Sequence, residues 1–324
     1  MKLSEIGEFK LIKRFLSGLP KFPSGVLLGP GDDCAVVRWG SSLQLLTTDM
    51  LIEGVHFRRD WMTPKEIGEK AMLVNLSDIA AMGGTPRYAL VSVGLPRSFS
   101  IAEAERLFVG MARTGEKYGV EIVGGDTNAS ERLIVAITLL GEPAGDRVLT
   151  RSGARVGDAV YVSGTLGESA LGLEALRKGK GRGYERFIGR HRRPPCRIDV
   201  GKRLARAAAV HSLIDLSDGL AGDLRHILEE SGVGAEVDIE KVPVSPGFFE
   251  KARRLGRDAD LLKLAGGEDY ELLWTASPGA GMPRKINGVP VAKIGTILPK
   301  GAGLRLIDSR GKRFRKKISG FRHF

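Results

Sequence analysis

The segment LLTTDMLIEGVHF, residues 45–57, is the stretch around which this chain is organised. It starts as a short apolar run, which predicts a buried β-strand, and it passes into two hydroxyls and a carboxylate before a turn at Gly54. The same order recurs at residues 122–126 (IVGGD) and 213–218 (LIDLSD), and residues 29–33 (GPGDD) add two acids in a turn. Because sheet folds bind ligands at strand ends, these acids predict a group of hard oxygen ligands for Mg²⁺. The alternative is that the Asp and Gly residues simply form turns.

Two capping boxes predict where helices begin in the first half of the chain. Thr63 and Glu66 flank Pro64 and predict a helix that ends near residue 82, and Ser100 with Glu103 predicts another that ends near residue 118. Apolar runs at residues 88–95, 120–123 and 133–140 predict strands, so helices and strands alternate and the fold class is α/β.

Asp78 stands late in the first of these predicted helices, among mostly apolar neighbours. A carboxylate is costly to bury there unless it has a partner, and a metal ion would supply one. The alternative is an aspartate on an exposed face of the helix, although acids are unfavourable near a helix C-terminus.

The length of 324 residues predicts two domains. A segment rich in Gly, Pro and charges at residues 141–157 marks the boundary, and we place the domains at residues 1–147 and 148–324. The first ten residues lack the apolar core of a signal peptide, and no apolar run is long enough to predict a membrane span. Cys34 and Cys196 are far apart in sequence, which favours free thiols in a cytoplasmic protein.

The chain is basic, with a net charge of +12 and a sequence pI of about 9.8. The basic residues gather at 177–193 and 310–317, and neither group is interleaved with aromatic side chains that could stack on bases. We therefore consider nucleic acid an unlikely ligand. A solvated basic face, or attraction of polyphosphate ligands, explains the excess as well.

The sequence lacks the motifs of several enzyme classes. There is no GxxxxGK[ST] of P-loop enzymes, no HRD and DFG pair of protein kinases, and no HExxH or Cys/His cluster for zinc. A glycine-rich chain with many aspartates and no nucleophile constellation fits phosphoryl transfer, which needs mainly positioning and neutralisation of charge by metal ions.

Seven segments, taken together and in order, resemble the thiamine-monophosphate kinase family, which belongs to the superfamily of aminoimidazole ribonucleotide synthetase and selenophosphate synthetase. They are GPGDD (29–33), TTD with EGVHF (47–57), NLSDIAAMG (75–83), GGDT (124–127), LTRSG (149–153), DLSDGL (215–220) and GEDYEL (267–272). The resemblance implies a two-domain α/β fold that dimerises through its N-terminal sheets. It also implies Mg²⁺-dependent transfer of phosphate from ATP to thiamine monophosphate, giving thiamine diphosphate.

The resemblance further assigns roles to individual residues. The implied Mg²⁺ ligands are Asp33, Thr47, Thr48, Asp49, Asp78, Asp126, Asp215 and Asp218. The implied ATP contacts are Tyr118, Gly125, Asp126, Arg151 and Ser217. The implied contacts to thiamine monophosphate are His56, Glu268 and the aromatic side chain of Phe321. Since the acceptor is itself a phosphate, we expect direct in-line transfer without a covalent enzyme intermediate.

The sequence departs from the family pattern at a few positions. Pro30 and Met50 replace a usual aliphatic residue and a usual Thr, Asn128 and Ala129 follow GGDT where Thr-Arg is common, and Arg322 replaces the usual Asp after the terminal aromatic residue. Two rival functions are a sister enzyme of the superfamily that acts on another substrate, and a basic binding protein without enzymatic activity.

Overall fold

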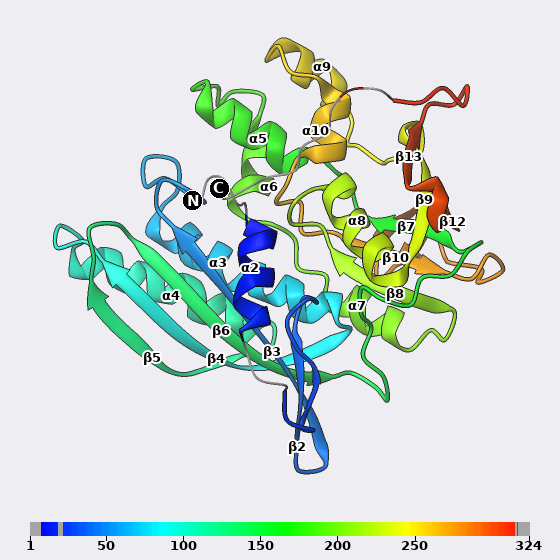
Figure 1. Cartoon of the computed structure of the whole chain (residues 1–324). Helices are drawn as coiled ribbons and strands as arrows, with labels where there is room; N and C mark the ends of the chain where they lie inside the picture. The colour runs from blue at the N-terminus through cyan, green and yellow to red at the C-terminus, as the bar shows by residue number, and fades with distance from the viewer. Residues whose placement is uncertain (1–7, 19–21, 315, 317–324) are drawn as a thin grey trace.

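The computed structural model describes residues 8–18, 22–314 and 316, and it contains two mixed sheets, each with its own helices (Figure 1). The N-terminal sheet has the strand order β1-β2-β3-β6-β4-β5. Its strands are β1 (Val26–Leu28), β2 (Ala35–Trp39), β3 (Ser42–Ile52), β4 (Gly84–Leu95), β5 (Glu121–Ala129) and β6 (Ile134–Pro143). All neighbouring pairs are antiparallel except β4 and β5.

The C-terminal sheet has the order β13-β9-β12-β7-β10-β8, with β11 paired to β12. Its strands are β7 (Ala159–Ser163), β8 (Val210–Asp215), β9 (Val233–Asp238), β10 (Leu272–Ala276), β11 (Lys285–Ile286), β12 (Val289–Pro299) and β13 (Leu304–Ile307). Only β13 and β9 run parallel.

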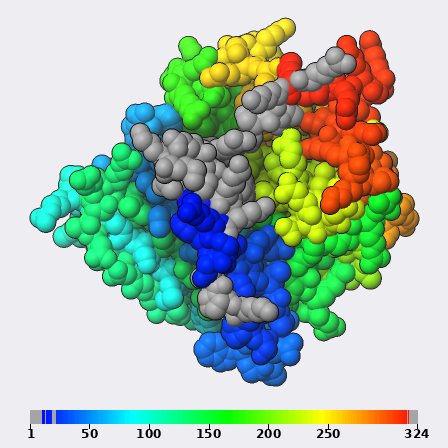
Figure 2. Space-filling model, in the orientation of Figure 1, coloured from blue at the N-terminus to red at the C-terminus, as the bar shows by residue number. Residues whose placement is uncertain are grey.

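The helices of the first half are α2 (Glu8–Ser17), α3 (Pro64–Ala81) and α4 (Ile101–Lys117). Those of the second half are α5 (Glu168–Arg177), α6 (Glu185–Arg192), α7 (Ile198–Ala205), α8 (Leu220–Ser231), α9 (Phe248–Arg254) and α10 (Ala259–Ala265), with 3₁₀ turns at Ile239–Lys241 and Lys300–Ala302. None of the helices in the described part of the chain is both long enough and apolar enough to cross a membrane. Figure 2 shows α2, in dark blue, on the surface between the two halves of the molecule.

Helix α3 is the element that joins the two halves. Fourteen of its 18 residues are buried, because it contacts β3, β4 and β6 of the N-terminal sheet as well as β8 and α7 of the C-terminal half. One apolar core therefore runs from Leu45 and Met72 to Leu213 and Trp274. The α/β fold with two sheets confirms the predicted fold class, while the boundary placed between residues 147 and 148 stays a prediction; it falls between β6 and β7.

Both predicted capping boxes are confirmed. Thr63 and Ser100 accept hydrogen bonds from the backbone N–H groups of Glu66 and Glu103, whose carboxylates in turn accept from the capping residues. Three short helices and one short strand of the second half have no clear signal in the sequence: α6, α9, α10 and β13. Their apolar residues contact local clusters rather than following a clear period.

A close contact between α3 and α7 generates the first prediction. A Cβ atom added to Gly201 would lie 2.1 Å from the carbonyl oxygen of Ala80, whereas a Cβ added to Gly189, within α6, would meet nothing within 4 Å. We expect Gly201→Ala to destabilise the protein by about 1–3 kcal/mol through overpacking. Gly189→Ala should stabilise it by roughly 0.5–1 kcal/mol, since alanine favours a helix over glycine. Urea unfolding followed by circular dichroism measures both, and equal effects of the two variants would contradict the predicted packing.

Candidate active site

Three aspartates from distant parts of the sequence meet where the two halves of the molecule join. Asp33 precedes β2, Asp78 lies in the last turn of α3, and Asp215 ends β8. Each offers one carboxylate oxygen, and these oxygens all lie within 4.8 Å of one another. Because like charges in a buried site repel, this arrangement requires either protons or a cation to hold it together.

Burial raises the pKa values of these acids, and repulsion from neighbouring carboxylates raises those of Asp78 and Asp215 further. Burial, followed by the charge of Asp33, raises the pKa of Asp215 to about 8. Burial and the charges of Asp49 and Asp215 raise the pKa of Asp78 well above its ordinary value. Asp32, next to the group, has its pKa raised to about 7 by burial and by Asp33. Without a cation, several of these carboxyls therefore hold protons near neutral pH.

Short hydrogen bonds fix the orientation of each carboxylate. Thr47 Oγ1 on β3 donates to Asp78 over 2.5 Å, and Ser77 Oγ on α3 donates to Asp215 over 2.6 Å. Arg151 Nη2 donates to Asp33 over 2.6 Å from the segment that connects the two sheets. The sequence thus brings β3, α3, β8 and the connecting segment together through side chains rather than through backbone pairing.

The donor set fits a divalent cation such as Mg²⁺. Asp33 Oδ2 is buried and has no hydrogen-bond partner among the described residues, so one lone pair of the group is left for a ligand. The ligand atoms are carboxylate oxygens, which Mg²⁺ prefers. A cation held by Asp33, Asp78 and Asp215 would supply positive charge that offsets their mutual repulsion.

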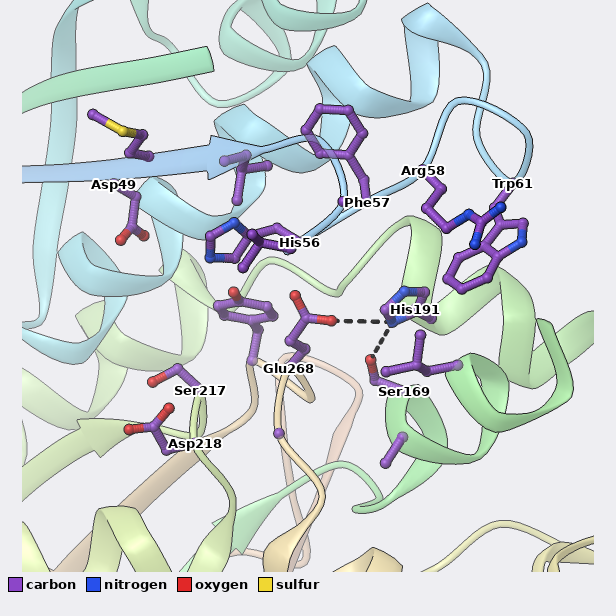
Figure 3. Close-up of a pocket in the computed structure, with 18 of the residues that line it drawn as sticks. Asp49, His56, Phe57, Arg58, Trp61, Ser169, His191, Ser217, Asp218 and Glu268 are labelled. Carbon is purple, nitrogen blue, oxygen red and sulfur yellow. Dashed lines mark hydrogen bonds and ion pairs between the residues drawn. The ribbon is translucent and has the colours of Figure 1, made fainter. Parts of the chain in front are cut away.

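A cavity of about 570 Å³ opens beside this group and is lined by both halves of the chain (Figure 3). At one end it reaches Asp49, Asp78, Ser217 and Asp218. Apolar and aromatic side chains form much of its remaining wall, namely Val55, Phe57, Trp61, Leu173 and Tyr270. Charged and imidazole side chains lie among them, namely His56, Arg58, Arg177, His191 and Glu268. One end of the cavity therefore suits a cation with phosphate, and the other suits a flat organic ring.

Local sequence explains how β3 serves two faces of its sheet. Successive strand residues point to opposite sides, so Thr47 and Asp49 face the site while Thr48 faces away. Thr48 Oγ1 donates to the carbonyl oxygen of Ile137 over 3.1 Å and accepts from Thr138 on the open face of the sheet. The predicted role of the Thr48 hydroxyl as a Mg²⁺ ligand stays a prediction, and within one chain its side chain lies outside the acid group.

The predicted residues on the far edge of the N-terminal sheet also lie away from the cavity. Gly125 and Asp126 are on β5, three strands from β3, and Tyr118 ends α4. Asp126 is exposed and accepts from the side-chain amide of Asn128 over 2.6 Å. Gly125 approaches β4 so closely that a Cβ atom there would lie 1.8 Å from Val91 O.

The other predicted ligand contacts fall as follows. His56, Ser217 and Glu268 line the cavity, and Arg151 pairs with Asp33 of the acid group. Asp218 also lines the cavity and forms a second possible cation-binding group with Asp223 and His226 on α8. Phe321, the third predicted contact to the acceptor, lies outside the described residues.

Sequence reasoning missed several residues of the cavity. Trp61 and Leu173 line it, and so does His191 on α6. Lys70, in the middle of α3, is fully buried behind it and pairs with Glu268. The one available signal is that Lys70 directly precedes the apolar run of residues 71–74 in a predicted helix, where a lysine is rarely buried without a partner.

Family models and known structures agree with this geometry. Residues 31–142 match the model for the AIR synthase related protein, N-terminal domain, and residues 155–282 match the C-terminal domain of the same family. The thiamine-monophosphate kinase of Aquifex aeolicus (strain VF5) is 43% identical over 279 residues, covering 85% of this chain and 87% of that protein. That of Haemophilus influenzae is 39% identical over 279 residues, covering 84% and 82%.

The chain belongs to the thiamine-monophosphate kinase family. A solved structure of a family member, AaThiL complexed with AMPPCP and TMP, matches with a TM-score of 0.86 at 38% identity, covering 100% of this chain and 99% of that one. The family resemblance expected from the sequence motifs is thereby confirmed, as is the fold. The hydrogenase maturation protein HypE shares the fold at a TM-score of 0.70 and 21% identity.

The raised pKa values predict how a cation stabilises this family member at different pH. A carboxyl whose pKa is higher in the folded state lowers stability as pH rises from its unfolded value near 4 to its folded value, here about 7 for Asp32 and about 8 for Asp215. Mg²⁺ should offset this loss of stability at a pH where the carboxylates are already deprotonated. At lower pH the ion would first have to displace their protons. We therefore expect millimolar Mg²⁺ to raise the melting temperature by several degrees at about pH 8 and by much less at about pH 5.5.

Differential scanning fluorimetry in Mg²⁺ or chelator measures this difference. Asp215→Asn removes one of the three carboxylates and one of the repelling charges, so its melting temperature should respond weakly to Mg²⁺ at both pH values. A response to Mg²⁺ that is the same at both pH values in the unmodified protein would count against a cation bound by these carboxylates.

Proposed function

We propose that this protein transfers the γ-phosphate of ATP to thiamine monophosphate and releases thiamine diphosphate and ADP. The observation that carries the proposal is the cavity that joins an acidic, cation-suited end to an aromatic end with an ionised Glu268. Relatives with 43% and 39% identity are thiamine-monophosphate kinases, and a related structure holds AMPPCP and TMP. AMPPCP has the shape and charge of ATP.

The chemistry needs little beyond orientation and charge neutralisation. A phosphate oxygen of thiamine monophosphate forms a bond to the γ-phosphorus as the bond from that phosphorus to the β–γ bridging oxygen breaks, and ADP leaves with the electron pair. Bound Mg²⁺ would supply the positive charge that two anionic reactants require. The acceptor phosphate is already a nucleophile, so no side chain has to remove a proton from it.

The residues of this chain act mainly by holding groups in place. Thr47 and Ser77 orient the carboxylates of Asp78 and Asp215. Ser217 stands at the acidic end of the cavity for a nucleotide phosphate, and Arg151, which pairs with Asp33, offers a planar donor group. Aromatic and apolar side chains around the other end exclude water from the organic rings of the acceptor.

A homodimer built on the N-terminal sheet accounts for the predicted nucleotide contacts that lie far from the cavity. One face of that sheet carries exposed apolar side chains, including Met50, Tyr88, Leu90 and Val123, and β5 forms its edge. Exposed apolar surface of this kind is typical of an interface. We propose that pairing of two such sheets brings Asp126 and its neighbours on β5 to the partner's site. We also place the enzyme in the cytoplasm, where ATP is available and where Cys34 and Cys196 stay free thiols.

A product assay tests the proposed reaction. With ATP and Mg²⁺, thiamine monophosphate should give thiamine diphosphate and ADP in equal amounts, separated by chromatography. Free thiamine should give no diphosphate and at most about 1% of the rate, because its neutral hydroxyl needs a general base, and in the proposed site the acids serve as metal ligands instead. ADP formation without thiamine diphosphate, or equal use of thiamine, would move the protein to another reaction of the superfamily.

Disruption of the exposed sheet face tests the dimer. The unmodified protein should elute at the mass of a dimer in size-exclusion chromatography with light scattering at micromolar concentration. Leu90→Asp places a charge on a 43% exposed side chain of β4, next to the edge strand β5. It should shift the protein toward the 34.9 kDa monomer and lower activity at least tenfold. Phe249→Asp, on α9 of the other half and 51% exposed, is the matched control and should stay dimeric. A monomeric unmodified protein with full activity would contradict the shared site.

A further inference from the structure

We propose that Lys70 and His191 are positioning residues, which hold the Glu268 carboxylate in one place so that it recognises the cationic ring of the acceptor. This inference rests on the proposed function and deepens it. Glu268 is predicted to contact the acceptor, but nothing in the sequence motifs says what keeps its flexible side chain in the cavity. The structure provides two partners, one from each half of the chain.

Lys70 is the partner from the N-terminal half. Its side chain is fully buried in α3, and its ammonium lies 2.9 Å from Glu268 Oε1 and 3.2 Å from the carbonyl oxygen of His56. It does not line the cavity, so its influence on an acceptor must pass through Glu268 or the backbone of His56. Surface ion pairs are usually weak, partly because two flexible side chains must lose rotamer freedom to form them. Lys70 is buried and has two fixed acceptors, so its pair with Glu268 costs little further freedom.

His191 is the partner from the C-terminal half. Its Nδ1 lies 3.0 Å from Glu268 Oε2 and 3.2 Å from Ser169 Oγ, as the dashed lines in Figure 3 show. An ionised carboxylate can only accept, so Nδ1 carries the proton and donates to Glu268. Burial, followed by the nearby charge of Lys70, lowers the pKa of His191, which keeps the ring neutral. Each oxygen of Glu268 thus has its own donor.

The backbone around Glu268 is fixed in the same way. Glu268 and Tyr270 line the cavity with φ values of 63° and 49°, a left-handed conformation that costs about 1–2 kcal/mol for each such residue. The residues between and after them point into the protein. Asp269 accepts from the backbone N–H groups of Gly167 and Ser169 over 2.5 and 3.2 Å at the start of α5.

Glu271 completes this anchoring. It is fully buried, and Arg190 and Arg197 donate to it over 2.9 and 2.5 Å. Alternate residues of this short segment are therefore tied to the C-terminal half, while the residues between them are presented to the cavity. A segment held this firmly serves to place a particular carboxylate at a particular point.

Glu268 differs in charge from Asp78, which lies at the other end of the cavity and whose pKa is raised by burial. Burial alone would raise the pKa of Glu268, but Lys70 and His191 outweigh burial and lower the pKa to about 2. The carboxylate is ionised at any physiological pH without a metal ion. An ionised carboxylate beside an aromatic wall suits a cationic aromatic ring such as the thiazolium.

The test is a set of double-mutant cycles in steady-state kinetics with ATP and thiamine monophosphate. Lys70→Met and His191→Phe each remove one donor, and each should raise the KM for thiamine monophosphate about tenfold, the effect of losing one charge-assisted hydrogen bond. The KM for ATP and kcat should change less than about threefold. In the Glu268→Gln background, neither substitution should raise that KM further, because both act through the carboxylate.

Conservative variants and a control on the same helix complete the experiment. Lys70→Arg and His191→Asn keep a donor and should restore the KM to within about threefold of the unmodified protein. Lys65→Met removes a half-exposed lysine of α3 that pairs only loosely with Glu69, at 3.7 Å, and should leave the KM unchanged. If Lys70→Met does not fold, as judged by circular dichroism, the His191 cycle alone decides.

Additive effects in the Glu268→Gln background, or an unchanged KM in both single variants, would overturn the inference. If the unmodified protein makes no thiamine diphosphate from thiamine monophosphate, the proposed function fails, and that result is distinct from every outcome of the cycles.

Discussion

The structure depends on burying several carboxylates close together where its two halves meet, and helix α3 makes this possible. Its side chains donate to two acids of the C-terminal half: Ser77 to Asp215, and Lys70 to Glu268. Its own acid, Asp78, accepts from Thr47 on β3, and Asn75 accepts from the backbone of Asp49. A buried polar group without a partner would cost several kcal/mol. The hydrogen bonds of the site therefore fix the position of α3, and the position of α3 fixes the site.

The two ends of the cavity treat negative charge in opposite ways. Burial raises the pKa values of Asp33, Asp78 and Asp215, and the charges of neighbouring acids raise those of Asp78 and Asp215 further, so the group is stable only when protons or a cation share it. Around Glu268, a lysine and a histidine hold the carboxylate ionised. An acceptor with phosphate at one end and a permanently cationic ring at the other matches this difference, and a neutral or uniformly anionic molecule does not.

The basic excess has a structural explanation in the region of α6. Residues 177–193 were interpreted as a solvated basic face or as an attraction for polyphosphate ligands, but several of their arginines bind buried carboxylates. Arg186 and Arg190 pair with Glu168, and Arg190 also reaches Glu271. Arg192 and Arg193 pair with Glu66 and Glu69 at the start of α3. These arginines connect α6 to both halves of the chain, so much of the local positive charge is already neutralised.

The sequence by itself determined the α/β class, the two capped helices and the acids at strand ends. These features are local: a capping box needs four residues, and a strand that ends in an acid is visible in seven. It also placed Asp33, Asp78 and Asp215 as candidates, although it could not bring them within 4.8 Å of one another.

Only the tertiary structure decided which side of β3 each hydroxyl faces, and it separated Thr48 and Asp126 from the acid group of their own chain. It alone revealed Lys70 and His191. Both pair with the carboxylate of Glu268, which follows Lys70 by about 200 residues and His191 by 77 residues in the sequence. A lysine in an apolar helix is at most a weak local signal, and it does not name its partner, because the packing of α3 against the second half of the chain fixes the ion pair.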